Sequence, residues 1–356
     1  MPATLLSMLP TSRVRAVLVA GLLCFSAGTA QAGTIFGFVG ATLGGGFRWD
    51  ADPLNVVGVG ERSLDGGLRY SVQGGSFQAY RDLFSWTIVP TVADFTQAIA
   101  DAFGAWTSID PVTGLSTSLS FVADLGTPVV GFNIGNGGLD VRGAEIDLFG
   151  STDAGFWNVG NTGLQGETRF NTVNDPVTLT SGTVSYAGAR AISGADIIIN
   201  SNPGALYTLD VFRRLLTHEI GHAIGLGDVE GDINPGAFID DNYNGASSAT
   251  ALATLTNSWA LLVNPFDPAS SPLARFTVPF ANPGTTTPGV NILMESRGLG
   301  IGAGNPVTNL VPLTNDDYGT RQFLYPTIAV PVPEPGTLVL LTAGLLSWRA
   351  RRRISH

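Results

Sequence analysis

Two histidines and a glutamate lie together in the segment 218–222, which reads His-Glu-Ile-Gly-His. On a helix, residues four apart lie one above the other, so His218 and His222 project from one face and can bind one metal ion. Zinc accepts imidazole nitrogen, and catalytic zinc sites keep a position for water. Glu219 lies one step around the helix, close enough to act on that water without being a ligand. The spacing favours a metal site with a general base.

Two imidazoles do not complete a zinc site, so a third ligand must follow. Gly225 lets the chain leave the helix in a conformation that most residues resist, and Asp228 comes three residues later. A tight turn would bring the Asp228 carboxylate to the same ion. An ordinary turn residue is the alternative, because Glu230 and Asp232 are nearby and turns often carry aspartate. For the whole motif, the alternative is that the two histidines are ordinary core residues. The Glu219 carboxylate would then be buried beside them, which costs free energy unless a cation is present.

The helix that carries these residues has clear end signals. We predict it over residues 209–224, with Thr208 as its N-cap and Asp210 in its first turn. Gly225 and Gly227 are expected to end it. These signals place the His-Glu-x-x-His run in the C-terminal part of the helix.

The rest of the chain predicts mixed strands and helices. Alternating or β-branched runs favour strands at 68–72, 118–122 and 195–200. Apolar residues at three- and four-residue steps predict a helix over 92–106, and a second helix is predicted over 314–324. A proline-rich, loop-like stretch then separates the site helix from that last helix, over residues 231–289. The expected class is α+β.

The site helix resembles the signature of the metzincin metallopeptidases, His-Glu-x-x-His-x-x-Gly-x-x-His or Asp, and most of all the matrixin branch. Metzincins carry a methionine turn beneath the metal, and the similar segment 291–296 contains Met294. Four further segments match matrixin patterns in family order. They are Ala102-Phe103-Gly104-Ala105-Trp106, Leu119-Ser120-Phe121, Ala195-Asp196-Ile197, and Asp316-Asp317-Tyr318-Gly319 with Leu324-Tyr325.

This resemblance implies a zincin-like catalytic domain with a mixed twisted sheet, an active-site helix and an irregular C-terminal half. It implies one catalytic Zn²⁺ held by His218, His222 and Asp228, with Glu219 as the general base and Met294 in a structural role. It further implies that a protein or peptide substrate lies extended along an edge strand. That strand is expected at Ala195, Asp196, Ile197, Ile198 and Ile199.

The sequence departs from the matrixins in two respects. The third ligand is an aspartate instead of the usual histidine, and the distance from Asp228 to Met294 is much longer than in matrixins. The acidic, glycine-rich stretch Asp140–Asn161 could hold structural Ca²⁺, as matrixins do, or could be a solvated loop.

The N-terminal residues have the pattern of a signal peptide. Arg13 and Arg15 precede the apolar stretch Ala16–Ala27, and residues 30–32 (Ala-Gln-Ala) form a small-x-small cleavage site. We therefore expect a signal peptide over 1–32. The only cysteine of the chain lies inside it, so no disulfide is expected in the mature protein.

The C-terminal residues 331–356 contain Pro-Glu-Pro, an apolar run over 336–348 and an arginine cluster. This tail resembles the PEP-CTERM sorting signal of Gram-negative bacteria. The resemblance implies export to the cell surface or extracellular matrix, removal of the tail by an exosortase-type enzyme, and transient contact with the inner membrane. The apolar run reaches only about 20 Å as a helix, short of a comfortable span. A plain membrane anchor is the alternative.

The remaining residues, 33–330, are expected to form one matrixin-like domain. The whole chain has 18 basic and 28 acidic residues. Setting aside two leader arginines, four tail arginines and Glu334 leaves 12 basic and 27 acidic residues, which disfavours nucleic acid as a partner.

The predicted function is that of an exported zinc metalloendopeptidase in which Glu219 activates water for hydrolysis of a peptide bond. One alternative is a non-catalytic surface or matrix protein on a zincin fold. Another is a zinc enzyme that acts on something other than peptides. A retained Glu219 favours the enzyme, because a binding module needs no general base.

Overall fold

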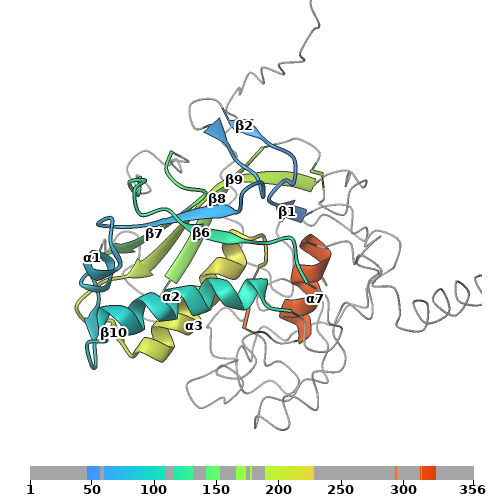
Figure 1. The fold of residues 1–356 in the computed structure, drawn as a ribbon. Helices are drawn as coiled ribbons and strands as arrows, with labels where there is room; N and C mark the ends of the chain where they lie inside the picture. The colour runs from blue at the N-terminus through green and yellow to red at the C-terminus, as the bar shows by residue number, and fades with distance from the viewer. Residues whose placement is uncertain are drawn as a thin grey trace, which may run out of the picture.

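The structure is a computed structural model in which the described residues form a sheet covered by helices on one face (Figure 1). The described residues are 46–56, 60–109, 116–130, 142–152, 166–173, 177–178, 189–227, 293–294, 313 and 315–325. Three predicted segments lie outside them: the leader 1–32, the loop 231–289 and the tail 331–356.

Ten strands and four helices are named within this part of the chain. The strands are β1 (Gly46–Arg48), β2 (Asn55–Val56), β3 (Gly60–Glu61), β4 (Leu68–Val72), β5 (Ser85–Trp86), β6 (Phe121–Ala123), β7 (Ile146–Ser151), β8 (Gly166–Val173), β9 (Ala189–Asn200) and β10 (Leu206–Tyr207). The helices are α1 (Phe77–Arg81), α2 (Val92–Thr107), α3 (Leu209–Ala223) and α7 (Asn315–Leu324).

The main sheet has the strand order β1-β9-β7-β4-β6, and every pair along this path is parallel. Strand β8 adds to β9 in the antiparallel direction. Both β7 and β8 pair with residues 195–199, so β8 must lie on the edge of β9 opposite to β7. The expected mixed sheet is confirmed, with mainly parallel strands in a mixed α/β arrangement.

This topology corrects one prediction. Residues Ala195–Ile199 were expected to form an edge strand, but they pair with β7 on one side and with β8 on the other. Their backbone groups are therefore already used inside the sheet. Within the described residues, β8 pairs with no strand on its far side, so it is the outer strand beside α3.

The two faces of the sheet differ because side chains alternate along each strand. One face carries apolar residues such as Tyr70, Leu148 and Ile197, which join the buried core with α2 and α3. The opposite face carries polar and charged side chains, such as those of Arg69, Asp147 and Asp196. Helices cover the apolar face (Figure 1).

Helices α2 and α3 pack against each other below the sheet (Figure 1). The predicted apolar stripe of α2 is confirmed, because Phe95, Ile99, Phe103 and Trp106 are all buried. The Trp106 indole N–H donates to the Thr217 carbonyl oxygen at 2.8 Å. This bond fixes α2 against the turn of α3 that precedes its two histidines.

Segments from both ends of the described chain meet at the C-terminal end of α3. The Trp49 indole N–H donates to the Ala223 carbonyl oxygen at 3.0 Å, and the Tyr325 hydroxyl donates to the Ile224 carbonyl oxygen at 2.7 Å. The Tyr325 hydroxyl also accepts from the Trp49 amide at 3.1 Å. Carbonyl groups at the end of a helix lack partners within it, and these two donors satisfy them.

The local predictions hold closely for the described elements. The site helix runs over 209–223 with Thr208 as its N-cap, whose side chain accepts from the Val211 amide, and with Asp210 in its first turn. Strand 68–72 is confirmed, and the predicted helices at 92–106 and 314–324 correspond to α2 and α7. Two strands have different bounds: β6 starts at Phe121, and β9 already begins at Ala189.

Gly225 ends α3 with φ +102°, and a Cβ at this position would collide with the Phe47 carbonyl oxygen of β1. We therefore expect Gly225→Ala to lower the free energy of unfolding by more than about 2 kcal/mol, because backbone strain and a clash with main chain add. Chemical denaturation measures this change.

Gly104 provides the matched control, since it lies exposed within α2 and a Cβ there would meet nothing within 4 Å. Gly104→Ala should raise stability by roughly 0.5–1 kcal/mol. Equal effects of the two substitutions would contradict the assignment of Gly225 as a conformationally required helix end.

Candidate functional site

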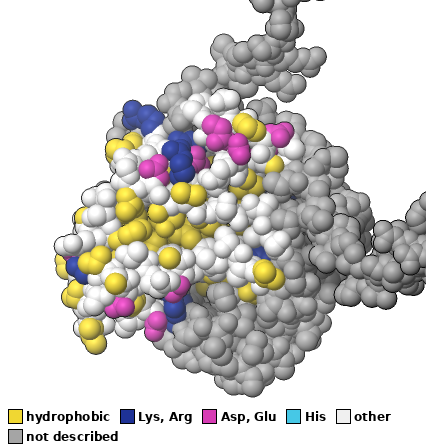
Figure 2. All heavy atoms as spheres, viewed as in Figure 1, with side chains coloured by type: hydrophobic (Ala, Val, Ile, Leu, Met, Phe, Trp, Pro, Cys, Tyr) yellow, Lys and Arg dark blue, Asp and Glu magenta, His cyan; other side chains and the backbone are white. Residues whose placement is uncertain are grey.

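The three residues of the His-Glu-x-x-His run lie on α3 and are buried. His218 is 5% exposed, Glu219 is 2% exposed and His222 is 7% exposed. Figure 2 shows no histidine among the described residues on the face turned to the viewer, where apolar side chains gather instead. Burial of three polar side chains on one helix is costly unless each finds partners.

Both imidazoles use their Nδ1 atoms on main-chain carbonyl groups. His218 Nδ1 lies 2.7 Å from the Leu293 carbonyl oxygen, and His222 Nδ1 lies 2.8 Å from the Leu226 carbonyl oxygen. A carbonyl oxygen can only accept a hydrogen bond, so each Nδ1 must carry the hydrogen. Each Nε2 is then the nitrogen suited to bind a metal ion, as in histidines that coordinate metals through Nε2.

The two Nε2 atoms face each other at 3.0 Å, and the rings lie at 88° to one another. Two nitrogen lone pairs at this distance repel unless a positive charge lies between them. Either a metal ion or a proton shared by the rings can supply that charge. The sequence-predicted pair, His218 and His222, is thus brought together with the nitrogens oriented toward a common point.

Strand β8 contacts Glu219, which the sequence had not suggested. The Thr168 hydroxyl lies 2.7 Å from Glu219 Oε2 and 2.9 Å from the Glu219 carbonyl oxygen. A Cβ at Gly166 would lie 2.5 Å from Glu219 Oε1. The threonines, Phe170 and Val173 of residues 166–173 were the available signal for a strand, but no local pattern pairs it with a residue 51 positions away.

The residues beneath the histidines support the site helix closely. Met294 is 1% exposed, and its side chain together with the Trp106 ring occupies the space that a Cβ at Gly221 would need. The Leu293 amide donates to Asp317 Oδ2 of α7 at 3.1 Å. Leu293 therefore links α7 to His218, because its carbonyl group contacts the imidazole. Leu293 and Met294, the described residues of the predicted methionine turn, lie against the site helix.

Asp228, the predicted third ligand, lies outside the described residues. Within the described ranges, no group of three or more His, Cys, Asp or Glu side chains is placed to hold a metal ion. The described part of the stretch Asp140–Asn161 is limited to residues 142–152, so the calcium site also stays a prediction.

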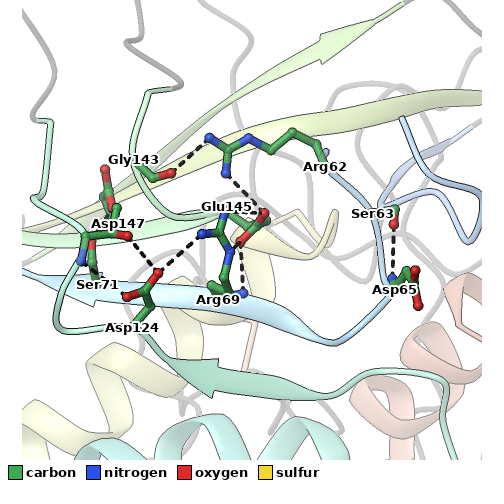
Figure 3. Close-up of polar contacts among 10 residues, drawn as sticks. Arg62, Ser63, Asp65, Arg69, Ser71, Asp124, Gly143, Glu145 and Asp147 are labelled. Atoms are coloured by element: carbon green, nitrogen blue, oxygen red, sulfur yellow. Dashed lines mark hydrogen bonds and ion pairs between the residues drawn. The ribbon is translucent and has the colours of Figure 1, made fainter. Parts of the chain in front are cut away.

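A second set of charged residues lies on the polar face of the sheet (Figure 3). The buried Glu145 carboxylate accepts from Arg62 at 3.1 Å and from Arg69 Nε at 2.9 Å. Arg69 also contacts Asp124 at 3.2 Å, and hydrogen bonding to Glu145 raises the pKa of Arg69. Since Arg69 lies on β4 and Glu145 directly precedes β7, this network joins neighbouring strands on the face remote from α3.

Asp147 lies beside this network and is 2% exposed (Figure 3). Burial raises the pKa of the Asp147 carboxyl to about 6, although hydrogen bonds from the Ser71 hydroxyl and the Val130 amide oppose the shift. Its main-chain neighbour across the sheet is Asp196, also buried. The neutral form of Asp147 is therefore favoured in weakly acidic solution.

Comparison with known proteins identifies only the tail. Residues 331–353 match the PEP-CTERM protein-sorting motif. No curated protein and no solved structure matches the chain. The match confirms the sorting signal predicted at the C-terminus.

The matched motif marks the protein for export, for sorting through a C-terminal membrane-anchored stage and for processing by an exosortase-type enzyme. Among the helices that the structure describes, none has the length and apolar character needed to cross a membrane.

The raised pKa of Asp147 predicts a specific pH dependence of stability. Because the folded-state pKa lies above the unfolded-state value, the folded state binds this proton more tightly. The stabilisation is present below about pH 4 and is lost as the pH rises to about 6, a change on the order of 3 kcal/mol. Asp147→Asn should remove this part of the pH dependence when unfolding free energies are measured from pH 4 to 7.

Asp124→Asn is the control, because hydrogen bonding to Thr127 lowers the pKa of Asp124 and gives its contribution the opposite sign. A pH dependence in Asp147→Asn that equals the wild-type curve would refute the assignment to Asp147.

Proposed function

We propose that this protein is a zinc-dependent metalloendopeptidase of the metzincin type, exported by the PEP-CTERM route. The observation that carries the proposal is the convergence of His218 Nε2 and His222 Nε2 at 3.0 Å, with both Nδ1 atoms bound to carbonyl groups. In this arrangement both Nε2 atoms are buried and oriented toward one point. A cation between them relieves their repulsion.

The histidine geometry fits zinc. Two nitrogens on a tetrahedral zinc ion, each at about 2.0–2.1 Å, lie about 3.3 Å apart. The observed separation of 3.0 Å needs only a small opening of the pair. The Nδ1 contacts to Leu293 and Leu226 are the outer-shell hydrogen bonds that hold ligand imidazoles in orientation. We infer that Asp228 completes the ligand set, as the metzincin resemblance implies.

Zinc bound here would supply a Lewis acid that makes water more acidic and polarises a peptide carbonyl group. Glu219 then accepts the proton of the attacking water and transfers it to the leaving amine. Its burial beside the histidines keeps bulk water away from that transfer. A carboxylate in this position has no evident use in a purely structural site, so its presence supports hydrolysis.

The substrate strand is reassigned to β8. A peptide can extend a sheet only at an edge with available main-chain groups, and β8 is the outer strand beside α3. Thr168 of β8 contacts Glu219 directly, so a peptide added to β8 would lie near the general base. We propose that an extended protein or peptide segment binds along Gly166–Val173.

The proposed final location is the cell surface or extracellular matrix of a Gram-negative bacterium. The sorting motif supports this location, and it is equally compatible with a surface protein that binds zinc without hydrolysing peptides. Mature residues would begin near Gly33, after removal of the predicted signal peptide.

Zinc content and hydrolysis test the proposal together. We expect about one zinc per chain, which His218→Ala should abolish. Cleavage of a quenched protein substrate should be lost on chelation and restored by zinc. Glu219→Gln should keep the zinc and lower kcat at least about 100-fold, because it removes the general base. Zinc content is measured by atomic absorption beside the rate.

Glu61→Gln is the matched control, as Glu61 lies on β3, outside both α3 and the proposed substrate strand β8, and should keep both the zinc and the rate. Stoichiometric zinc without hydrolysis would favour the non-catalytic surface protein. A protein that binds no zinc would leave the shared proton as the charge between the rings and would refute the metal site.

Deletion of residues 332–356 tests the sorting assignment separately. We expect the deleted protein to be released or mislocalised, because it lacks the matched motif. Cell fractionation followed by immunoblotting measures this. The control is a variant with the arginine cluster and Pro-Glu-Pro intact but with the catalytic substitution Glu219→Gln, which should be sorted normally.

A further inference from the structure

One hydroxyl group contacts two oxygens of the same residue at the candidate site. Thr168 Oγ1 lies 2.7 Å from Glu219 Oε2 and 2.9 Å from the Glu219 main-chain oxygen. The hydroxyl has one hydrogen to donate, and the shorter distance favours the carboxylate oxygen as its acceptor. Rotation about the Glu219 side-chain bonds would break the shorter contact, so the hydroxyl selects one orientation of the carboxylate.

The other carboxylate oxygen lies against main chain. A Cβ at Gly166 would come within 2.5 Å of Glu219 Oε1 and 3.0 Å of its Cδ. Gly166 and Thr168 are two residues apart on β8, so both face α3. The carboxylate therefore rests on β8, with one oxygen over Gly166 and the other at the Thr168 hydroxyl. Any side chain at position 166 would displace it.

Both elements of this contact are anchored independently. Strand β8 pairs with β9 from Gly166 to Val173, and α3 packs against β8, β9 and α2. The separation between Thr168 and Glu219 is thus set by the fold and not by either side chain alone. A general base works only when it lies within hydrogen-bond reach of the proton that it removes.

We propose that Thr168 is a positioning residue for Glu219, and that it fixes the carboxylate relative to the strand along which the substrate binds. This inference rests on the proposed function. Thr168 does not touch the reacting atoms in this role. Because the hydroxyl lies on the inner side of β8, its removal leaves the main-chain groups at the outer edge unchanged, and substrate binding should be retained.

Kinetics of Thr168→Val and Thr168→Ser test the role. We expect Thr168→Val to lower kcat by about 10- to 100-fold at unchanged KM and unchanged zinc content, because the base is displaced. Thr168→Ser keeps the hydroxyl and should restore most of kcat. Thr127→Val is the control, because it removes a hydroxyl that lies 2.7 Å from the Asp124 carboxylate on the polar face of the sheet, away from α3 and β8, and it should match the wild type.

A second measurement tests the contact between Thr168 and Glu219 without relying on catalysis. In metal-free protein, Thr168→Val should lower the melting temperature more in the wild-type background than in the Glu219→Ala background. Additive shifts would overturn the contact. Gly166→Ala, which leaves the hydroxyl in place but displaces the carboxylate, should lower kcat in the same way as Thr168→Val.

The two proposals fail differently. An active, zinc-dependent wild type with undiminished kcat in Thr168→Val overturns the positioning role alone. A wild type without zinc-dependent hydrolysis overturns the proposed function and the positioning role together. A loss of kcat in Thr168→Val that Thr168→Ser does not restore also overturns the positioning role, because the hydroxyl would then not be the group responsible.

Discussion

Burial of three polar side chains on one helix is the constraint around which the described structure is arranged. Two imidazoles and a carboxylate on α3 are each less than a tenth exposed, and every one needs a polar partner in a space that excludes water. The partners come from segments far apart in sequence: the Leu293 carbonyl group, the Leu226 carbonyl group and the Thr168 hydroxyl. The sheet, the segment around Met294 and α7 can therefore be understood as the means of holding these partners at α3.

The same helix approaches its neighbours more closely than a helix with ordinary side chains could. Gly221 admits Met294 and Trp106 to the helix surface, and Gly225 admits the main chain of β1. Charge is kept on the other side of the sheet, where Glu145 is shared by Arg62 and Arg69. The sequence has a single cysteine, so it cannot form a disulfide within the chain. The division between an apolar, close-packed face and an ion-paired face gives the sheet cohesion on both sides.

Local signals predicted the site helix well because its ends are set by neighbours in sequence. Thr208 caps one end and Gly225 closes the other, and the i, i+4 spacing alone brings the two imidazoles together. The residues that surround the histidines were harder to predict from the sequence. Pairing of residues 195–199 on both edges depends on β8, which lies about 30 residues earlier and returns antiparallel. Thr168 acquires its contact with Glu219 only through that pairing, so no reading of residue types near the histidines could have identified it.

The hydrogen bonds that Trp49 and Tyr325 donate at the end of α3 bear on the order in which the structure can form. These two residues bracket almost all of the described chain, and Tyr325 lies only a few residues before the matched sorting motif. Since synthesis proceeds from the N-terminus, both hydrogen bonds at the end of α3 can be in place only after the chain has been made as far as Tyr325. The end of α3 is therefore among the last parts of the described structure to be completed, and a chain that ends before Tyr325 lacks this donor.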